Sequence, residues 1–214
     1  MARTRVFEID GAIDIATDLF WRTGYEGTSL TDLTNAMGIT PPSFYHAFGS
    51  KEGLFKRVLE RYMRNRLSYA EDALNQPTSR GVAEQTLLRL ADLYTDPKCP
   101  PGCLAVNSSF PCNDDSPPLR HELAGLREAR RVRLRERLER AQAAGDLPAD
   151  CDPDQLAEFV FVVGWGLALA AQSGATRDDL HRTVAIALKA WPKRPRPLPA
   201  KRPARPARPA RAMP

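Results

Sequence analysis

The sequence lacks the segments that would place the chain in or across a membrane. Its longest apolar stretch, 157–171, contains Glu158 and is shorter than a bilayer span. The first ten residues, MARTRVFEID, hold no apolar core of a signal peptide. We therefore expect a soluble, cytoplasmic protein without a membrane partner, whose four cysteines stay reduced.

Catalytic and metal-binding patterns are also scarce. The three histidines, His46, His121 and His181, are scattered along the chain. No Ser-His-Asp order and no glycine-rich phosphate loop accompanies them. The cysteines lack the Cys-x-x-Cys pairs and the fourth ligand of a structural zinc site. We expect no enzymatic activity, no metal and no cofactor.

The net charge of +5 is unevenly distributed. Residues 192–214 carry eight lysines and arginines and no acid, so the rest of the chain has a net charge of −3. Dense proline and an Ala-Arg-Pro repeat predict that this basic tail is extended and disordered. Its charges either follow DNA phosphates or only keep the chain soluble, and the sequence leaves both open.

The most informative stretch is 28–55, TSLTDLTNAMGITPPSFYHAFGSKEGLF. Ser29 and Asp32 have the spacing of a capping box at the start of a helix. Gly38 is placed to end that helix with positive φ. Thr40 then caps a second helix, whose first turn holds two prolines. The pattern predicts two short helices joined by a tight turn.

The second of these helices has one apolar and one polar side. Phe44 and Phe48 are four residues apart and can face a core. Ser43, Tyr45 and His46 then point outward. This is the arrangement of a helix-turn-helix, whose second helix lies in the DNA major groove.

Flanking residues extend the pattern to A-x-x-L-F, G-Y-x-G-T-S and F-Y-x-x-F-x-S-K-x-x-L within roughly the first 60 residues. The combined pattern resembles the TetR/AcrR family of transcriptional regulators. Gly53 departs from it, because the family more often has an acidic residue there. The resemblance implies an N-terminal three-helix DNA-binding domain over 1–50, supported by the start of a helix 51–75. A helical effector-binding and dimerisation domain over 51–191 and the tail 192–214 would follow.

The sequence pattern of the rest of the chain is typical of helices, and it predicts an all-α fold. Apolar residues at helical spacing and capping residues predict helices over 4–23, 50–74, 81–94, 103–110, 119–144, 153–173 and 176–190.

The predicted helix 153–173 is apolar on nearly every side and so needs cover all round. We expect a homodimer that pairs through 153–173 and 176–191, as the resemblance also implies. The alternative is an ordinary buried helix. Two related copies would read a palindromic operator, because one recognition helix touches too few base pairs.

Candidate DNA contacts combine groove-facing side chains with donors for phosphates. Tyr45, His46 and Ser43 are positioned to contact the DNA groove. The alternatives are that Tyr45 is partly buried and packs against the protein, and that His46 is only solvated. Lys51 offers a charge to the backbone, and helix-start threonines offer hydroxyl and N–H groups. The predicted set is Thr28, Thr40, Pro41, Ser43, Tyr45, His46 and Lys51.

The resemblance also implies an unidentified small-molecule effector in the C-terminal helices. Its binding would change the separation of two DNA-reading heads. The predicted cavity walls are Leu87, Leu90, Tyr94, Phe110, Phe159, Val163 and Trp165, each with plain core packing as the alternative.

Three cysteines, Cys99, Cys103 and Cys112, offer a different input, since nearby thiols can sense oxidants, electrophiles or a soft metal. A small buried hydrophobe is the alternative for Cys103. We thus expect a regulator, most simply a repressor released from a palindromic operator by an effector. A thiol-based redox or metal sensor and an architectural DNA-binding protein without inducer remain as alternatives.

Overall fold

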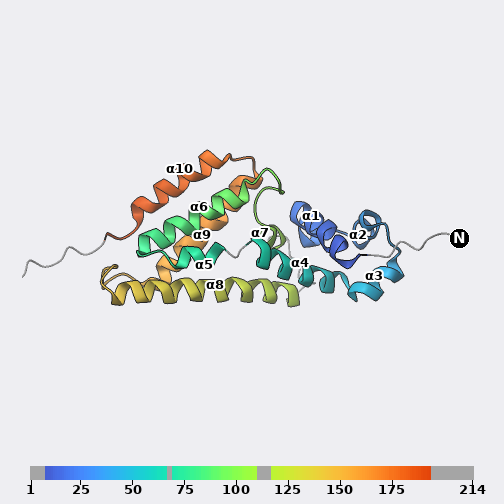
Figure 1. Ribbon diagram of the computed structural model, residues 1–214, viewed down its shortest axis with the longest axis horizontal. Coiled ribbons are helices and arrows are strands. Elements are labelled where there is room, and N and C mark those ends of the chain that lie inside the picture. The colour runs from blue at the N-terminus through green and yellow to red at the C-terminus, as the bar shows by residue number, and fades with distance from the viewer. Residues whose placement is uncertain (1–7, 67–68, 110–116, 194–214) are drawn as a thin grey trace, which may run out of the picture.

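The computed structural model describes residues 8–66, 69–109 and 117–193, and within these ranges every regular element is a helix. The predicted all-α fold is confirmed. Figure 1 shows an elongated molecule, with the N-terminal helices at one end and α8 running along one long side. The helices are α1 Ile9–Gly27, α2 Leu30–Met37, α3 Pro41–Phe48, α4 Lys51–Arg66, α5 Tyr69–Leu74, α6 Ser79–Tyr94, α7 Leu104–Ser109, α8 Pro117–Ala143, α9 Pro153–Gln172, α10 Arg177–Ala187 and the 3-10 turn Leu188–Ala190.

The N-terminal helices close on an aromatic core. Phe20 of α1 is fully buried, and its ring meets Phe55 of α4 edge to face at 4.9 Å between centroids. Regular α1 geometry breaks at Gly24, where φ is +73°. The sequence predicted this break, because glycine adopts positive φ without a steric penalty. The predicted start of the helix at residue 4 falls outside the described residues.

Helix α4 supports this core from below. It buries five apolar side chains, Leu54, Phe55, Val58, Leu59 and Tyr62. The Ser50 hydroxyl accepts a hydrogen bond from the Gly53 amide at 2.9 Å, so Ser50 caps the start of the helix. The predicted single helix 50–74 is present as α4 and α5, and residues 67–68 between them lie outside the described residues.

The C-terminal half is a bundle in which α9 packs against α6, α8 and α10. Asp152 caps α9 by accepting the Asp154 amide at 2.9 Å, and Pro153 occupies its first turn. Helix α9, Pro153–Gln172, is long and apolar enough to cross a membrane by length and composition alone. The apolar stretch 157–171 considered in the sequence analysis underestimated the length of this segment. Packing against three helices buries 33% of the apolar 18-residue window, so it accounts for only part of this apolar character.

The two halves meet where α1 packs against α7. The Trp21 indole N–H donates to the Gly102 carbonyl at 3.3 Å, and the Asn107 side-chain amide donates to the Trp21 carbonyl at 2.9 Å. A Cβ on Gly24 would lie 2.9 Å from the Asn107 carbonyl oxygen. Helix α1, which packs with the other N-terminal helices, is therefore held closely to the C-terminal half. The division into domains 1–50 and 51–191 stays a prediction.

Candidate nucleic-acid interface

Local hydrogen bonds fix both the start of α2 and the turn that leads from it to α3. The Ser29 hydroxyl accepts the Asp32 amide at 3.0 Å, and the Asp32 carboxylate accepts the Ser29 amide at 2.9 Å. The Ser29 side-chain and backbone hydrogen bonds lower the pKa of Asp32. Gly38 ends α2 in the left-handed region, with φ of 66°. The predicted capping box and glycine turn are thus confirmed.

Helix α3 is anchored by its apolar side. Phe44 and Phe48 are 0% and 5% exposed, and Thr40 caps the helix by accepting the Ser43 amide at 3.5 Å. Pro41 lies at the first helical position, where no N–H is needed. The exposed residues of the helix are Pro41, Pro42, Ser43, Tyr45 and His46. The outward face that the sequence predicted is therefore present.

Tyr45 is the largest side chain on this face. It is 51% exposed, and its ring meets Phe44 edge to face at 5.8 Å. This contact supports the base of the ring while leaving the phenol in solvent. Tyr45 is thus positioned for an external partner, and its contact with DNA stays a prediction.

Lys51 is held beside the N-terminal core at the start of α4. Its ammonium lies 4.2 Å from the centroid of the Tyr25 ring, a cation–π contact that fixes the side chain. Burial lowers the pKa of Lys51, and the charges of Glu26 and Asp32 act in the opposite direction. The structure thus places a positioned cation close to the helix-turn-helix.

Thr28 differs from the prediction. It is 1% exposed, and its hydroxyl donates to the Gly24 carbonyl at 2.7 Å and lies 2.6 Å from the Thr23 hydroxyl. Its amide bonds to the Tyr25 carbonyl at 3.4 Å. Thr28 closes the end of α1 instead of opening α2, so neither group is free for a phosphate in this conformation.

Arg57 is a candidate that the sequence did not single out. It is exposed on α4, and its guanidinium lies 5.6 Å from the centroid of the Phe48 ring at the end of α3. One arginine on an amphipathic helix carries no sequence signal. The contact between α3 and α4 places it beside the end of α3.

The residues predicted to wall an effector cavity are packed within the C-terminal helices. Leu87 and Tyr94 are buried, and Phe159 and Val163 are half-buried, as are Leu90 and Trp165. A Cβ on Gly164 would lie 3.0 Å from Leu90, so α6 and α9 approach closely there. Phe110 lies outside the described residues. The predicted cavity therefore stays a prediction, with core packing as its alternative.

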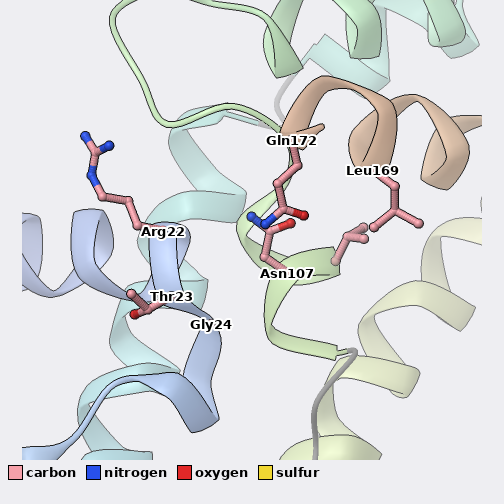
Figure 2. A pocket seen from close by; sticks show the side chains of 7 residues that line it. Arg22, Thr23, Gly24, Asn107, Leu169 and Gln172 are labelled. Carbon is pink, nitrogen blue, oxygen red and sulfur yellow. The ribbon is translucent and has the colours of Figure 1, made fainter. Parts of the chain in front are cut away.

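The structure describes a hollow elsewhere, between α1, α7 and α9 (Figure 2). None of the predicted wall residues lines it. Its lining consists of Arg22, Thr23, Gly24, Val106, Asn107, Leu169 and Gln172. No sequence pattern indicated this hollow, because it depends on how distant segments pack.

Two of the three candidate sensor thiols lie where α4 faces the loop before α7. Cys99 accepts a hydrogen bond from Arg66, which also pairs with Asp96 at 3.1 Å. Burial raises the pKa of Cys99, and Arg66 opposes that rise. Cys103 is 5% exposed and accepts the Tyr62 hydroxyl at 3.5 Å.

The third candidate thiol, Cys112, lies outside the described residues. Across the part of the chain that the structure does describe, no group of three or more His, Cys, Asp or Glu side chains is arranged to hold a metal ion. A thiol role for the cysteines stays a prediction.

Comparison with known proteins places these features in a family. Residues 12–58 match the family model described as bacterial regulatory proteins, tetR family, and residues 84–193 match the tetracyclin repressor-like C-terminal domain. The HTH-type transcriptional repressor ComR of Escherichia coli strain K12 is 33% identical over 89% of this chain and 92% of its own length. The repressor BdcR of the same strain is 30% identical over 88% and 91%.

Solved structures of TetR family regulators are also similar to this chain. A cysteine-substituted form of the TetR family transcriptional regulator CifR, solved with 26-base-pair operator DNA, is 40% identical. It covers 89% of this chain and all of its own, with a TM-score of 0.82. These matches confirm the resemblance that the helix-turn-helix residues carried, and members of the family are regulators and not enzymes. The chain belongs to the TetR family of helix-turn-helix transcriptional regulators.

Proposed function

We propose that this protein is a transcriptional repressor that binds a palindromic operator as a homodimer and leaves it when a small effector binds. The observation that carries the proposal is the exposed face of α3, held outward by buried Phe44 and Phe48. Two relatives at 33% and 30% identity are named as repressors, and CifR was solved with operator DNA. These relationships support the same role here.

On this proposal α3 enters the major groove. Ser43, Tyr45 and His46 face base edges, and Pro41 leads the helix into the groove. The Thr40 hydroxyl at the start of α3 approaches a phosphate, because hydroxyl groups at helix N-termini contact phosphate oxygens. Lys51 and Arg57 supply charge to the DNA backbone and set the salt dependence.

Dimerisation rests on apolar side chains that the monomer leaves in solvent. Val162 of α9 is 54% exposed and Ile186 of α10 is 65% exposed. Burying both against a second copy removes apolar surface from water. A two-fold axis there would present two α3 helices to successive major grooves, as an inverted repeat requires.

Effector control would act through the junction between the halves. Helix α4 packs against α1 and α3 at one end and meets the loop at Cys99 at the other. A ligand that prefers one arrangement of the C-terminal helices shifts the population of the arrangement that fits the operator. We expect the protein to act in the cytoplasm, because a regulator that binds operator DNA must share a compartment with that DNA.

Selection of bound fragments from a random DNA pool tests the proposal. The expected product is an inverted repeat, bound by two copies and protected at two half-sites about one helical turn apart. Recovery of unrelated sequences at equal affinity would refute sequence-specific binding and favour the architectural alternative, in which the tail 192–214 binds without specificity.

A second candidate input is the thiol of Cys99. The hydrogen bond from Arg66 supports it, because Arg66 also lies 5.7 Å from the Trp21 ring of α1. Modification of Cys99 would displace that arginine and disturb the contact between α4 and α1. In a reporter strain, serine at Cys99, Cys103 and Cys112 would then remove induction by oxidants, electrophiles or soft metals; unchanged induction would rule the thiols out.

A further inference from the structure

A buried carbonyl oxygen in the hollow between α1, α7 and α9 has no hydrogen-bond partner. Asn107 is 8% exposed, and its Oδ1 accepts no hydrogen bond within the described chain. The side-chain Nδ2 donates to the Trp21 carbonyl at 2.9 Å, which fixes the orientation. Turning the amide over would set two oxygens against each other. A buried acceptor without a donor is unfavourable, so Oδ1 calls for a partner from outside the chain.

The hollow that Asn107 lines exceeds what one ordered water needs. The hollow has a volume of about 310 Å³ and is partly open to solvent. A water molecule takes about 30 Å³ of liquid, whereas small-molecule sites begin at about 300 Å³. Figure 2 shows the Asn107 and Gln172 amides pointing toward each other across the hollow, with Leu169 on the neighbouring turn of α9. The dimensions therefore suit a compact organic molecule.

The lining defines the chemistry of the ligand. Asn107 offers an acceptor, and the Gln172 amide can donate or accept. Val106 and Leu169 supply an apolar wall. Arg22 is paired with Asp18 through bonds of 2.8 and 3.0 Å, so its charge is already compensated and does not select an anion.

We propose that this hollow binds a small neutral molecule that carries an N–H or O–H donor for Asn107 Oδ1 beside a short hydrocarbon group. A carboxamide fits this description: its N–H reaches Asn107, its carbonyl accepts from Gln172, and its alkyl part packs on Val106 and Leu169. The site is separate from the predicted effector cavity, since it shares none of those residues. Its walls join α1 to α7 and α9.

Titration of the full-length chain with isobutyramide, in the absence of DNA, tests the site. Selective ¹⁵N-asparagine labelling lets NMR follow the Asn107 side-chain amide, which lies next to the proposed acceptor. Gln172→Trp fills the hollow from an exposed position at the end of α9. Gln155→Trp places the same bulk at an exposed glutamine on the same helix outside the hollow and is the matched control.

In the original chain and in Gln155→Trp, the Asn107 resonance is expected to shift with isobutyramide concentration and to saturate. In Gln172→Trp, the apparent affinity for isobutyramide obtained from this shift should be at least tenfold lower. Nuclear Overhauser contacts from the isobutyramide methyls to Leu169 and Val106 give a second readout that needs no variant. A shift that grows linearly without saturating, or that is equal in both tryptophan variants, would mean that water alone solvates Oδ1. Either result, or the absence of the methyl contacts, would overturn the proposal.

Discussion

A Cβ atom placed on Gly53 would lie 2.3 Å from the carbonyl oxygen of Phe48. The first turn of α4 therefore passes directly against the last carbonyl of α3, and no side chain fits between them. The sequence showed Gly53 only as a departure from the acidic residue more common in this family. The packing gives a reason for a glycine at this position. The close approach fixes the angle between α3 and α4 and therefore the direction in which the exposed face of α3 points.

Gly53→Ala is expected to destabilise the protein by about 1–3 kcal/mol, because the added methyl overpacks the α3–α4 junction. Operator affinity should fall as well, since α3 must move to relieve the contact. Denaturant unfolding and fluorescence anisotropy measure the two effects. Gly125→Ala is the control, because that helical glycine is exposed with nothing within 4 Å. It should be neutral or stabilise by about 0.5–1 kcal/mol. Equal effects of the two substitutions would contradict this account.

Tyr45→Ala is expected to weaken operator binding by about tenfold or more while leaving stability almost unchanged. The side chain is 51% exposed, so its removal costs little packing. Tyr45→Phe separates the ring from the hydroxyl: retained affinity means that the ring makes the contact, and lost affinity means that the hydroxyl does. Anisotropy against the selected operator is the measurement. An Ala variant that binds as tightly as the original chain would leave Tyr45 outside the interface.

How much of this site the sequence predicts depends on the range of the interactions. The caps at Ser29 and Thr40 and the turn at Gly38 were predicted because each is set by neighbours within a few residues. Thr28 is an exception: its hydroxyl donates to the Gly24 carbonyl only four residues earlier and closes the end of α1, whereas the sequence was interpreted as placing it at the start of α2.

The longer-range features could not be predicted in the same way. Whether Leu90 lines a cavity depends on its distance from Gly164 on another helix, which no local pattern encodes. The orphan oxygen of Asn107 likewise arises from packing between distant segments. The fold class and the reading helix are therefore readable from the sequence, whereas the cavities are not.

Arg57→Gln is expected to reduce the slope of log affinity against log salt by about 0.9, the value for one lost phosphate contact on duplex DNA. Affinity should fall uniformly across operator variants, since a phosphate contact carries no sequence information. Arg140→Gln is the matched control, because Arg140 is exposed near the end of α8, far from α3 (Figure 1). An unchanged slope for Arg57→Gln would remove that residue from the interface.

Val162→Asp combined with Ile186→Asp is expected to raise the dimer Kd by about 100-fold or more, because each carboxylate would be buried without a partner at the proposed interface. Light scattering coupled to size exclusion gives the mass. Ile15→Asp is the control, since Ile15 is a 38% exposed isoleucine on α1, away from the proposed interface. A double variant that stays dimeric would move the interface off α9 and α10.

Cys99 is expected to react with iodoacetamide faster than Cys103, because Cys99 is half-buried whereas Cys103 is 5% exposed beneath the Tyr62 hydroxyl. Burial raises the pKa of Cys99, so the thiolate forms only at alkaline pH, and its alkylation rate should still be rising above pH ~8.5. Peptide mass spectrometry after timed quenching gives both rates. A Cys99 rate that levels off below neutral pH would indicate a thiolate stabilised by Arg66 and would strengthen the sensor alternative. A faster reaction at Cys103 would instead show that the junction between α4 and the loop opens in solution.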